Sequence, residues 1–313
     1  MSSIGSSATA TAASVRAGLT GARRHDAWGL VFEALLLASL LLSLAILFVL
    51  VADVLAKAAP VFADRGAGFL TSPLSSNPAK AGIVQGLVGT AILAAIVAGL
   101  AFPFGLATAI YLEEYAADTK LTRFIQVNVR NLAGVPSVVY GLLGLSVFVA
   151  FMDTVDGTGS GRNVVAGGIT LAVLVLPIVI ITSIEALRAV PNAIREAGYG
   201  VGASRWEVTR QLVLPSAAPG ILTGTVLALS RALGETAPLL LAGAVLGSFS
   251  GLSLSSLFTG SYTALPVIVY DWSRKPQDAF RADAAAAIVV LLLITLAANV
   301  IAVLLRNRYE RAW

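Results

Sequence analysis

Long apolar stretches separated by short polar segments dominate the sequence. Six of these stretches approach or exceed the roughly 20 residues that a helix needs to cross the hydrocarbon layer of a membrane. They cover residues 34–52, 86–112, 132–152, 164–184, 219–246 and 284–305. Backbone groups in lipid must find their hydrogen bonds within the protein, so apolar runs of this length predict helices. The pattern predicts an all-α polytopic membrane protein with about six transmembrane helices.

The composition agrees with a protein that lies mostly in lipid. Of 313 residues, 57% are hydrophobic and 12% are charged, whereas about a quarter of the residues in soluble domains are charged. The absence of cysteine excludes disulfides, thiolate metal sites and cysteine nucleophiles. The single histidine, His25, lies in a polar segment and is expected to be solvated. The sequence therefore predicts no bound metal or cofactor.

The segment before the first span, residues 1–24, is rich in serine, alanine, threonine and glycine and contains no acidic residue. It is predicted to be a disordered tail. The following apolar run could belong to a secretory signal, with a cleavage site at residues 56–58. That run is 19 residues long, however, and the apolar core of a signal peptide has about 7 to 15. We expect an uncleaved first transmembrane helix and an extracytoplasmic loop within residues 25–85.

The distribution of lysine and arginine predicts the orientation of the six spans. The two termini and the segments between spans two and three and between spans four and five carry thirteen of these residues, and the other side carries seven. Basic residues accumulate on the cytoplasmic side of membrane proteins, so both termini are expected there. The four tryptophans lie outside the spans or near their ends, which is typical of membrane interfaces. The net charge of +4 therefore reports topology, and no nucleic-acid partner is expected.

The segment between spans four and five, residues 191–215, contains signals for a helix, a turn and a second helix. Asn192 is a candidate cap for the first helix, and Gly200 and Gly202 are placed to end it. Ser204 with Glu207 three residues later predicts a capping box at the start of the second helix. A rigid feature of this kind suggests docking to another protein, although a pair of interfacial helices anchored by Trp206 is the alternative.

This segment resembles the EAA loop of bacterial ABC-importer permeases, whose pattern is E-A-A, three residues, G, nine residues, I-x-L-P. The matching positions are Glu196, Ala197, Gly198, Gly202, Leu212, Leu214 and Pro215. Gly198 replaces the second alanine and Leu212 the isoleucine, and the spacing is kept. The resemblance implies that this loop couples the permease to an ATPase subunit. No G-x-x-x-x-G-K-[ST] motif occurs in the sequence, so ATP and Mg²⁺ are expected to be used by a partner chain, and this chain is not expected to be an enzyme.

Arg231 and Glu235 are the only charges well inside an expected span. Each charge at the centre of a transmembrane helix costs about 2.5 to 3.5 kcal/mol on insertion scales. Their spacing of four residues places them on one helical face. They form either a self-neutralising structural pair or part of a polar path, and the second interpretation is favoured because Gly234 and Pro238 loosen the same turn.

Residues 230–240, which contain this pair, resemble the R-x-x-G-E-T-A-P-L-L segment of phosphate-specific ABC permeases, particularly their A-type subunits. Stretches 82–90, 134–142 and 265–272 agree with the same subunits. The resemblance implies a type I ABC importer permease fold over residues 86–308 and a location in the bacterial cytoplasmic membrane. It also implies Arg231, Glu235 and Thr236 in the substrate pathway.

The resemblance further implies a set of partners. These are a homologous C-type permease, an ATPase dimer and an extracytoplasmic phosphate-binding protein, with a phosphate-sensing regulator as a further possibility. Glu235 either accepts a proton from phosphate, which sulfate lacks, or only holds Arg231. The alternatives in function are a molybdate or sulfate permease, a secondary anion transporter and a membrane scaffold. A secondary transporter is expected to show an inverted repeat, and none is visible in the sequence.

Overall fold

The computed structural model describes residues 27–157, 160–244 and 260–310, and every regular element within these ranges is a helix. The predicted all-α fold is confirmed for this part of the chain. The predicted disordered tail, residues 1–24, lies outside it. Contacts divide the chain into two compact units, residues 1–53 and 54–313.

In the first unit, residues 27–53 belong to helix α2 (Ala27–Arg65). All described side chains from residue 28 to residue 53 are exposed. They include a nearly continuous series of leucine, isoleucine, valine and phenylalanine. A helix that is apolar on all sides requires lipid or other apolar helices around it, so this stretch has the properties of a membrane span.

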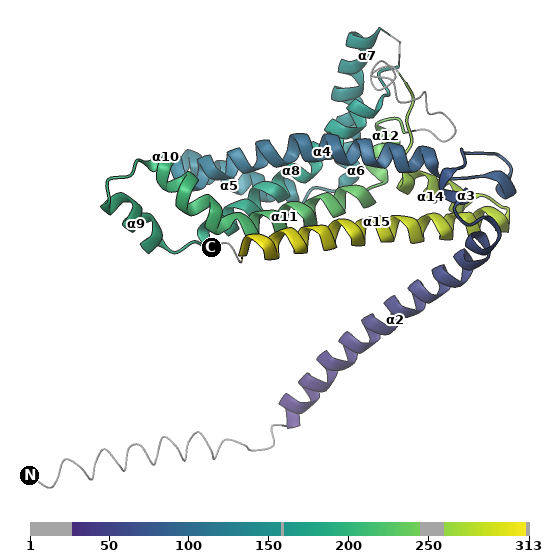
Figure 1. Cartoon of the computed structure of the whole chain (residues 1–313), viewed down its shortest axis with the longest axis horizontal. Coiled ribbons are helices and arrows are strands. Elements are labelled where there is room, and N and C mark those ends of the chain that lie inside the picture. The colour runs from purple at the N-terminus through teal and green to yellow at the C-terminus, as the bar shows by residue number, and fades with distance from the viewer. Residues whose placement is uncertain (1–26, 158–159, 245–259, 311–313) are drawn as a thin grey trace, which may run out of the picture. The chain divides into compact units, whose positions relative to one another are not determined.

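The second unit contains the rest of α2 and all other described helices (Figure 1). In chain order these are α3 (Gly68–Thr71), η1 (Pro78–Lys80), α4 (Val84–Ile110), η2 (Tyr111–Tyr115), α5 (Lys120–Ala133), α6 (Ser137–Leu143), η3 (Gly144–Val149), α7 (Ala150–Asp156), α8 (Val164–Arg188), α9 (Asn192–Gly200), α10 (Arg205–Val208), η4 (Thr209–Val213), α11 (Leu214–Gly234), α12 (Ala237–Leu241), α14 (Leu265–Arg274) and α15 (Asp278–Glu310). The segments η2, η3 and η4 are π-helical and continue directly into neighbouring α-helices.

Six helical segments of the described chain are long and apolar enough to span a membrane, which confirms the predicted number. They are Trp28–Arg65, Val84–Tyr115, Ser137–Val155, Val164–Arg188, Arg205–Gly234 and Asp278–Arg308. The predicted positions of the third and fifth spans are wrong at their ends. The ten-residue helix α14 was not predicted, because it is too short to appear as a span.

The third span begins at Ser137 and not at residue 132. Gly134 and Pro136 interrupt the apolar run, and the preceding residues form the separate helix α5. The side chain of Tyr140 donates a hydrogen bond of 2.9 Å to the backbone carbonyl of Leu132. This bond closes the turn, so the sequence bends where apolarity alone predicted a continuous helix.

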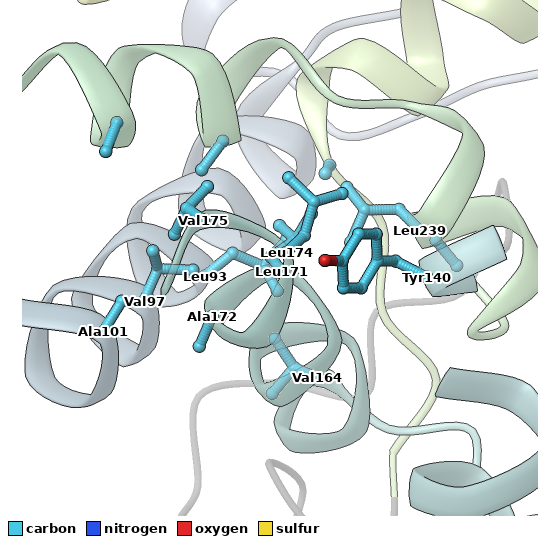
Figure 2. Close-up of a cluster of buried hydrophobic side chains, with 14 of the residues drawn as sticks. Leu93, Val97, Ala101, Tyr140, Val164, Leu171, Ala172, Leu174, Val175 and Leu239 are labelled. Carbon is cyan, nitrogen blue, oxygen red and sulfur yellow. The ribbon is translucent and has the colours of Figure 1, made fainter. Parts of the chain in front are cut away.

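Helix α8 is the most buried of the six spans and packs against α4 and α11. Leu171, Leu174 and Val175 of α8 meet Leu93 and Val97 of α4 in the main hydrophobic cluster (Figure 2). Helices also approach through glycine. A Cβ atom on Gly105 of α4 would lie 2.7 Å from a Val179 methyl group, and small residues of this kind allow close packing of membrane helices.

The end of α2 and the start of α15 are joined in a second cluster. Arg65 forms an ion pair with Asp283, whose side chain is 2% exposed. The rings of Phe69, Trp272 and Phe280 pack against each other at tilted angles, and the Arg65 guanidinium lies over the Phe69 ring. Trp272 is fully buried and lies in α14, outside the six candidate spans, so its indole packs inside the protein. Trp28 and Trp206 are exposed, and Trp313 lies outside the described residues.

Candidate functional site

The 191–215 loop contains α9 and α10 joined by a tight turn, as predicted. The capping box is present: the backbone N–H of Ser204 donates to Glu207 Oε2 at 2.8 Å, and the N–H of Glu207 donates to Ser204 Oγ at 3.4 Å. The predicted cap at Asn192 is wrong. Asn192 is the first residue of α9, Pro191 precedes it without a capping bond, and the Asn192 side chain accepts a hydrogen bond from Arg195 instead.

The turn between the two helices requires glycine at one position. Gly202 has φ +83°, a conformation that β-branched and bulky residues rarely adopt. Open space surrounds its Cα, so backbone conformation alone explains the glycine. Gly198 is different: it is buried, and a Cβ atom there would meet Val208 and Leu212 at 2.8 and 2.9 Å. The glycine that departs from the E-A-A pattern therefore lets α9 pack closely on α10 and η4.

Three large apolar side chains are exposed on the loop among polar and charged ones. Tyr199 is 46% exposed, Trp206 54% and Val201 85%. Glu196 and Ala197 are also exposed, whereas Leu214 and Pro215 are half-buried at the start of α11. Sequence reasoning predicted a docking role for this loop but did not assign Tyr199, Val201 or Trp206 to it. Their signal was available, because large apolar residues in a short polar segment are unusual outside an interaction surface.

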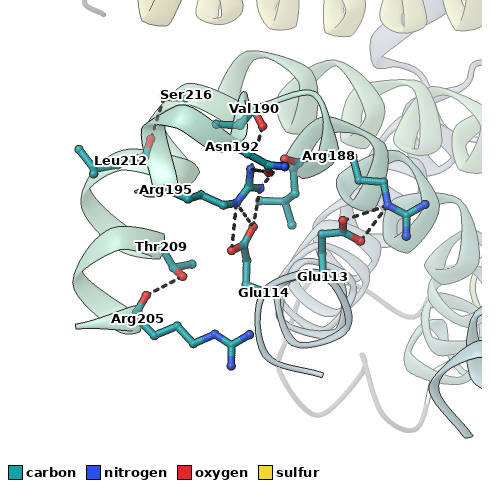
Figure 3. A network of polar contacts seen from close by, with 11 residues as sticks. Glu113, Glu114, Arg188, Val190, Asn192, Arg195, Arg205, Thr209, Leu212 and Ser216 are labelled. Atoms are coloured by element: carbon teal, nitrogen blue, oxygen red, sulfur yellow. Dashed lines mark hydrogen bonds and ion pairs between the residues drawn. The ribbon is translucent and has the colours of Figure 1, made fainter. Parts of the chain in front are cut away.

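A buried ion pair attaches the loop to η2, the π-helical segment that forms the end of the α4 span (Figure 3). The Arg195 Nη2 atom lies 2.7 Å from Glu114 Oε1, and the Arg195 Nε atom also donates to this carboxylate. The same guanidinium donates to the backbone carbonyls of Leu187 and Val190, at 2.9 and 2.7 Å. The side chain of Glu114 is 5% exposed. A single arginine therefore connects α9 to the ends of α4 and α8.

The residues on either side of Glu114 also contact arginines. Glu113 accepts from Arg188 Nε at 2.9 Å, in an ion pair that joins η2 to the last turn of α8. The guanidinium of Arg205 lies over the ring of Tyr115, 5.2 Å from its centroid. Close by in the chain, an exposed ion pair with Arg123 holds the pKa of the Asp118 carboxyl below its usual value, mainly through hydrogen bonding. Sequence reasoning treated these arginines only as topology signals.

The second group of predicted site residues lies at the other end of α11. Arg231 Nε is 3.4 Å from Glu235 Oε1, which confirms that the two side chains lie together. The Arg231 side chain is 52% exposed and that of Glu235 is 17% exposed. Because Arg231 comes 17 positions after Leu214 in α11 and a helix rises about 1.5 Å per residue, Arg231 is about 25 Å along the helix from Leu214 and Pro215.

The fifth span ends at Gly234, so the predicted continuous helix over residues 219–246 is wrong. Glu235 has an extended backbone (φ −77°, ψ 123°), and the short helix α12 starts at Ala237. Gly234 favours neither helix nor strand, and Pro238 prevents a regular continuation. Thr236 is half-buried directly after the break. The carboxylate therefore follows the helix and is not part of it.

The four sequence stretches that carried the family resemblance pair in space. The backbone N–H of Leu265 donates to Thr90 Oγ1 at 2.9 Å. A Cβ atom on Gly141 would lie 2.8 Å from the Cα of Pro238, so α6 and α12 approach with backbone almost in contact. Thr90, Leu233, Leu239 and Pro266, from three of these stretches, also line one small cavity, so the stretches pack around the break in the fifth span.

Comparison with known families decides the class of this protein. The model of the binding-protein-dependent transport system inner membrane component family matches residues 101–312. The chain belongs to this family. It is a multi-pass membrane protein of the permease class, and the resemblance found in the sequence is confirmed.

Several relatives of this permease have names that include a transported ion. It is 34% identical over 225 residues to "Phosphate transport system permease protein PstA 1" of Mycobacterium tuberculosis, which covers 72% of this chain and 70% of the relative. It is 33% identical to the PstA protein of Yersinia pestis, with 72% of each chain covered. A PstC protein of Mesorhizobium japonicum is 31% identical over 87% of this chain and 88% of its own.

Solved structures show the same fold at lower sequence identity. A bacterial alginate ABC transporter in complex with a periplasmic protein matches with a TM-score of 0.61 at 16% identity, covering 91% of this permease and 97% of that chain. The MetNI methionine ABC transporter, in an inward-facing conformation, matches with a TM-score of 0.57 at 18% identity. This match covers 72% of the permease and 95% of that chain. The permease therefore has the type I ABC importer permease fold.

A contact next to Arg231 orients α11 within this permease. Ser230 Oγ lies 2.8 Å from Asn299 Oδ1 on α15, and hydroxyl–amide contacts of this kind hold membrane helices in register. Asn299 was missed by sequence reasoning, because one asparagine in an apolar run does not reveal its partner. The contact fixes the rotation of the helix that carries Arg231.

Proposed function

We propose that this chain is a membrane-spanning subunit of an ATP-driven importer of inorganic phosphate. The observation that carries the proposal is the 34% identity, over 72% of the chain, to a permease named for phosphate transport. Arg231 and Glu235 give the proposal a chemical basis, because an exposed guanidinium is suited to an oxyanion. Arginine presents N–H groups in a fork that matches phosphate oxygens.

In this proposal Arg231 is the anion contact, and Glu235 and Thr236 border the same path. Phosphate near neutral pH keeps at least one proton, whereas sulfate has none. A carboxylate at 3.4 Å from Arg231 can accept this proton and repel an anion that lacks it. Glu235 acts in selectivity if it accepts the proton, and in positioning if it only holds Arg231.

The 191–215 loop is the docking site for the ATPase in this account. Its exposed apolar side chains, Tyr199, Val201 and Trp206, supply a surface that a protein groove can cover. Glu196, Ala197, Gly198 and Gly202 shape this surface, and Leu214 and Pro215 pass from it into α11. Since α11 has the loop at one end and Arg231 at the other, it is the direct mechanical connection between ATP hydrolysis and the path.

The complete transporter then requires further chains. Arg231 is half-exposed although it lies near the end of a span, which suits a path closed by a second, homologous permease of the C type. An ATPase dimer that binds ATP and Mg²⁺ and an extracytoplasmic phosphate-binding protein complete the assembly. The excess of basic residues on one side supports a cytoplasmic location for the 191–215 loop and both termini. A phosphate-sensing regulator is a further possible partner of this assembly.

The energy source tests this proposal against a secondary anion transporter. The purified complex, with all proposed subunits, is placed in vesicles with an ATP-regenerating system and labelled phosphate. Uptake should follow ATP hydrolysis and persist when ionophores dissipate the ion gradients. Uptake that disappears with the gradients while ATP remains would contradict the proposal.

A further inference from the structure

Three consecutive residues at the end of α4 contact three different parts of the chain. Glu113 pairs with Arg188 at the end of α8, Glu114 with Arg195 of α9, and the ring of Tyr115 lies under Arg205 of α10. All three belong to the π-helical segment η2, and π-helical turns are frequent at functional sites. The end of α4 therefore contacts both helices of the 191–215 loop.

Every N–H of the Arg195 guanidinium is used in this arrangement. Its Nε and Nη2 atoms donate to Glu114, Nη2 also donates to the Leu187 carbonyl, and Nη1 donates to Val190 and Asn192. Leu187 is in the last turn of α8, where carbonyls lack partners within the helix. Lysine has a single nitrogen and cannot reproduce this fork. The contact therefore depends on arginine geometry as well as on charge.

The two ion pairs of η2 differ in burial and in what they connect. The side chains of Glu114 and Arg195 are 5% and 16% exposed, compared with 18% and 39% for Glu113 and Arg188. The buried pair includes a loop residue, whereas the more exposed pair joins only the ends of α4 and α8. Exposed ion pairs contribute little to stability because solvent screens their charges. The Glu113–Arg188 pair is therefore a matched control for the Glu114–Arg195 pair.

We propose that Glu114 and Arg195 are positioning residues that make the loop, the end of α4 and the end of α8 move as one body. This inference rests on the proposed function, because it assigns the pair to transmission between the ATPase and the membrane helices. A displacement of α9 by the ATPase then reaches two helices at once, in addition to α11. Loss of the pair leaves the loop able to dock but unable to drive these helices.

The test compares transport with ATP consumption in the full complex. Arg195→Lys keeps a positive charge beside Glu114 and removes the fork, Glu114→Gln removes the charge, and Glu113→Gln is the matched control. Each variant is copurified with its partner subunits to measure assembly. Phosphate taken up per ATP hydrolysed is then measured in vesicles, since a merely structural role would not change this ratio in assembled complexes.

Arg195→Lys and Glu114→Gln are expected to assemble and hydrolyse ATP while the transport ratio falls at least about fivefold, the lower end of typical coupling between sites. Glu113→Gln should keep the wild-type ratio. A wild-type ratio in both test variants would overturn the inference, and so would loss of assembly in both, which would assign the pair to folding. Failure of the wild-type complex to take up phosphate would instead contradict the proposed function.

Discussion

Arg231 and Glu235 are in contact across the end of a helix: Arg231 is in the last turn of α11, and Glu235 is the first residue after it. An ion pair within a continuous helix would be held by the helix itself. Here the carboxylate is on extended backbone, next to Thr236 and the start of α12. The exposed guanidinium has only this carboxylate as a charged partner among the described residues. Within the described part of the chain, this arrangement leaves donor groups of Arg231 available for an anion.

The first prediction concerns the charge of Arg231. Arg231→Gln should abolish phosphate uptake in complexes that assemble normally, because a neutral amide cannot offset an anion where the dielectric constant is low. Arg231→Lys should retain partial activity, since it keeps the charge and loses the two-pronged contact. Uptake of labelled phosphate in vesicles, normalised to the amount of assembled complex, provides the measurement.

The double variant Arg231→Gln with Glu235→Gln separates the two roles considered for this pair. If the pair is purely structural, removal of both charges relieves the unpaired carboxylate and transport should recover. We expect assembly to be normal and uptake to remain absent. Recovery of uptake in the double variant would show that Arg231 does not contact the substrate.

The second prediction concerns the turn of the 191–215 loop. Gly202→Val places a β-branched residue at φ +83°, which costs about 1 to 2 kcal/mol and should redirect the turn. Substrate-stimulated ATP hydrolysis and phosphate uptake should both fall severalfold, with membrane insertion unchanged. Gly200→Val is the control, because Gly200 ends α9 without positive φ and with open space around it. Equal effects of the two substitutions would contradict a specific need for the turn.

The third prediction concerns topology, and the absence of cysteine makes it simple to test. Ser160, Ser204 and Asn307 are exposed, so single cysteines at these positions should react with a membrane-impermeant reagent. Ser204→Cys and Asn307→Cys should be labelled only with access to the cytoplasm, and Ser160→Cys only from outside. Labelling of positions 160 and 204 from the same side would exclude the six-span arrangement.

The fourth prediction concerns stability at the opposite end of the bundle from the loop. Asp283→Asn leaves the Arg65 guanidinium without its charged partner in a largely buried site, and breaking a buried pair costs about 3 to 5 kcal/mol. Thermal unfolding of the purified subunit should shift to clearly lower temperature. Asp278→Asn, which breaks an exposed pair with Arg281, should shift it little. Equal shifts would indicate that burial of the Arg65 pair adds no stability.

Local sequence signals predicted the elements that depend on neighbouring residues. The capping box of Ser204 and Glu207 and the turn at Gly202 were found because each needs only a few adjacent positions. Six spans followed from apolar run length. Asn192 was misassigned as a cap because Arg195, three residues away, takes its side chain instead. The break after Gly234 was underestimated, since apolar residues continue on both sides of it.

Contacts between distant parts of the chain were not predictable from patterns. Glu114 and Arg195 are 81 positions apart, and Ser230 and Asn299 are 69 apart. In both pairs, the sequence around one residue does not identify the residue that it contacts. The sequence therefore predicted the 191–215 loop and the charged pair, but the residues that hold both in place became visible only in the packed bundle.

Substrate competition in the complete transporter tests the central claim most directly. The purified complex in ATP-loaded vesicles is given labelled phosphate together with an excess of unlabelled phosphate, sulfate or molybdate. We predict ATP-dependent uptake that unlabelled phosphate suppresses and that sulfate and molybdate leave nearly unchanged. ATP-dependent uptake suppressed equally well by sulfate or molybdate, or no phosphate uptake by an assembled complex that hydrolyses ATP, would contradict the assignment of this chain to phosphate import.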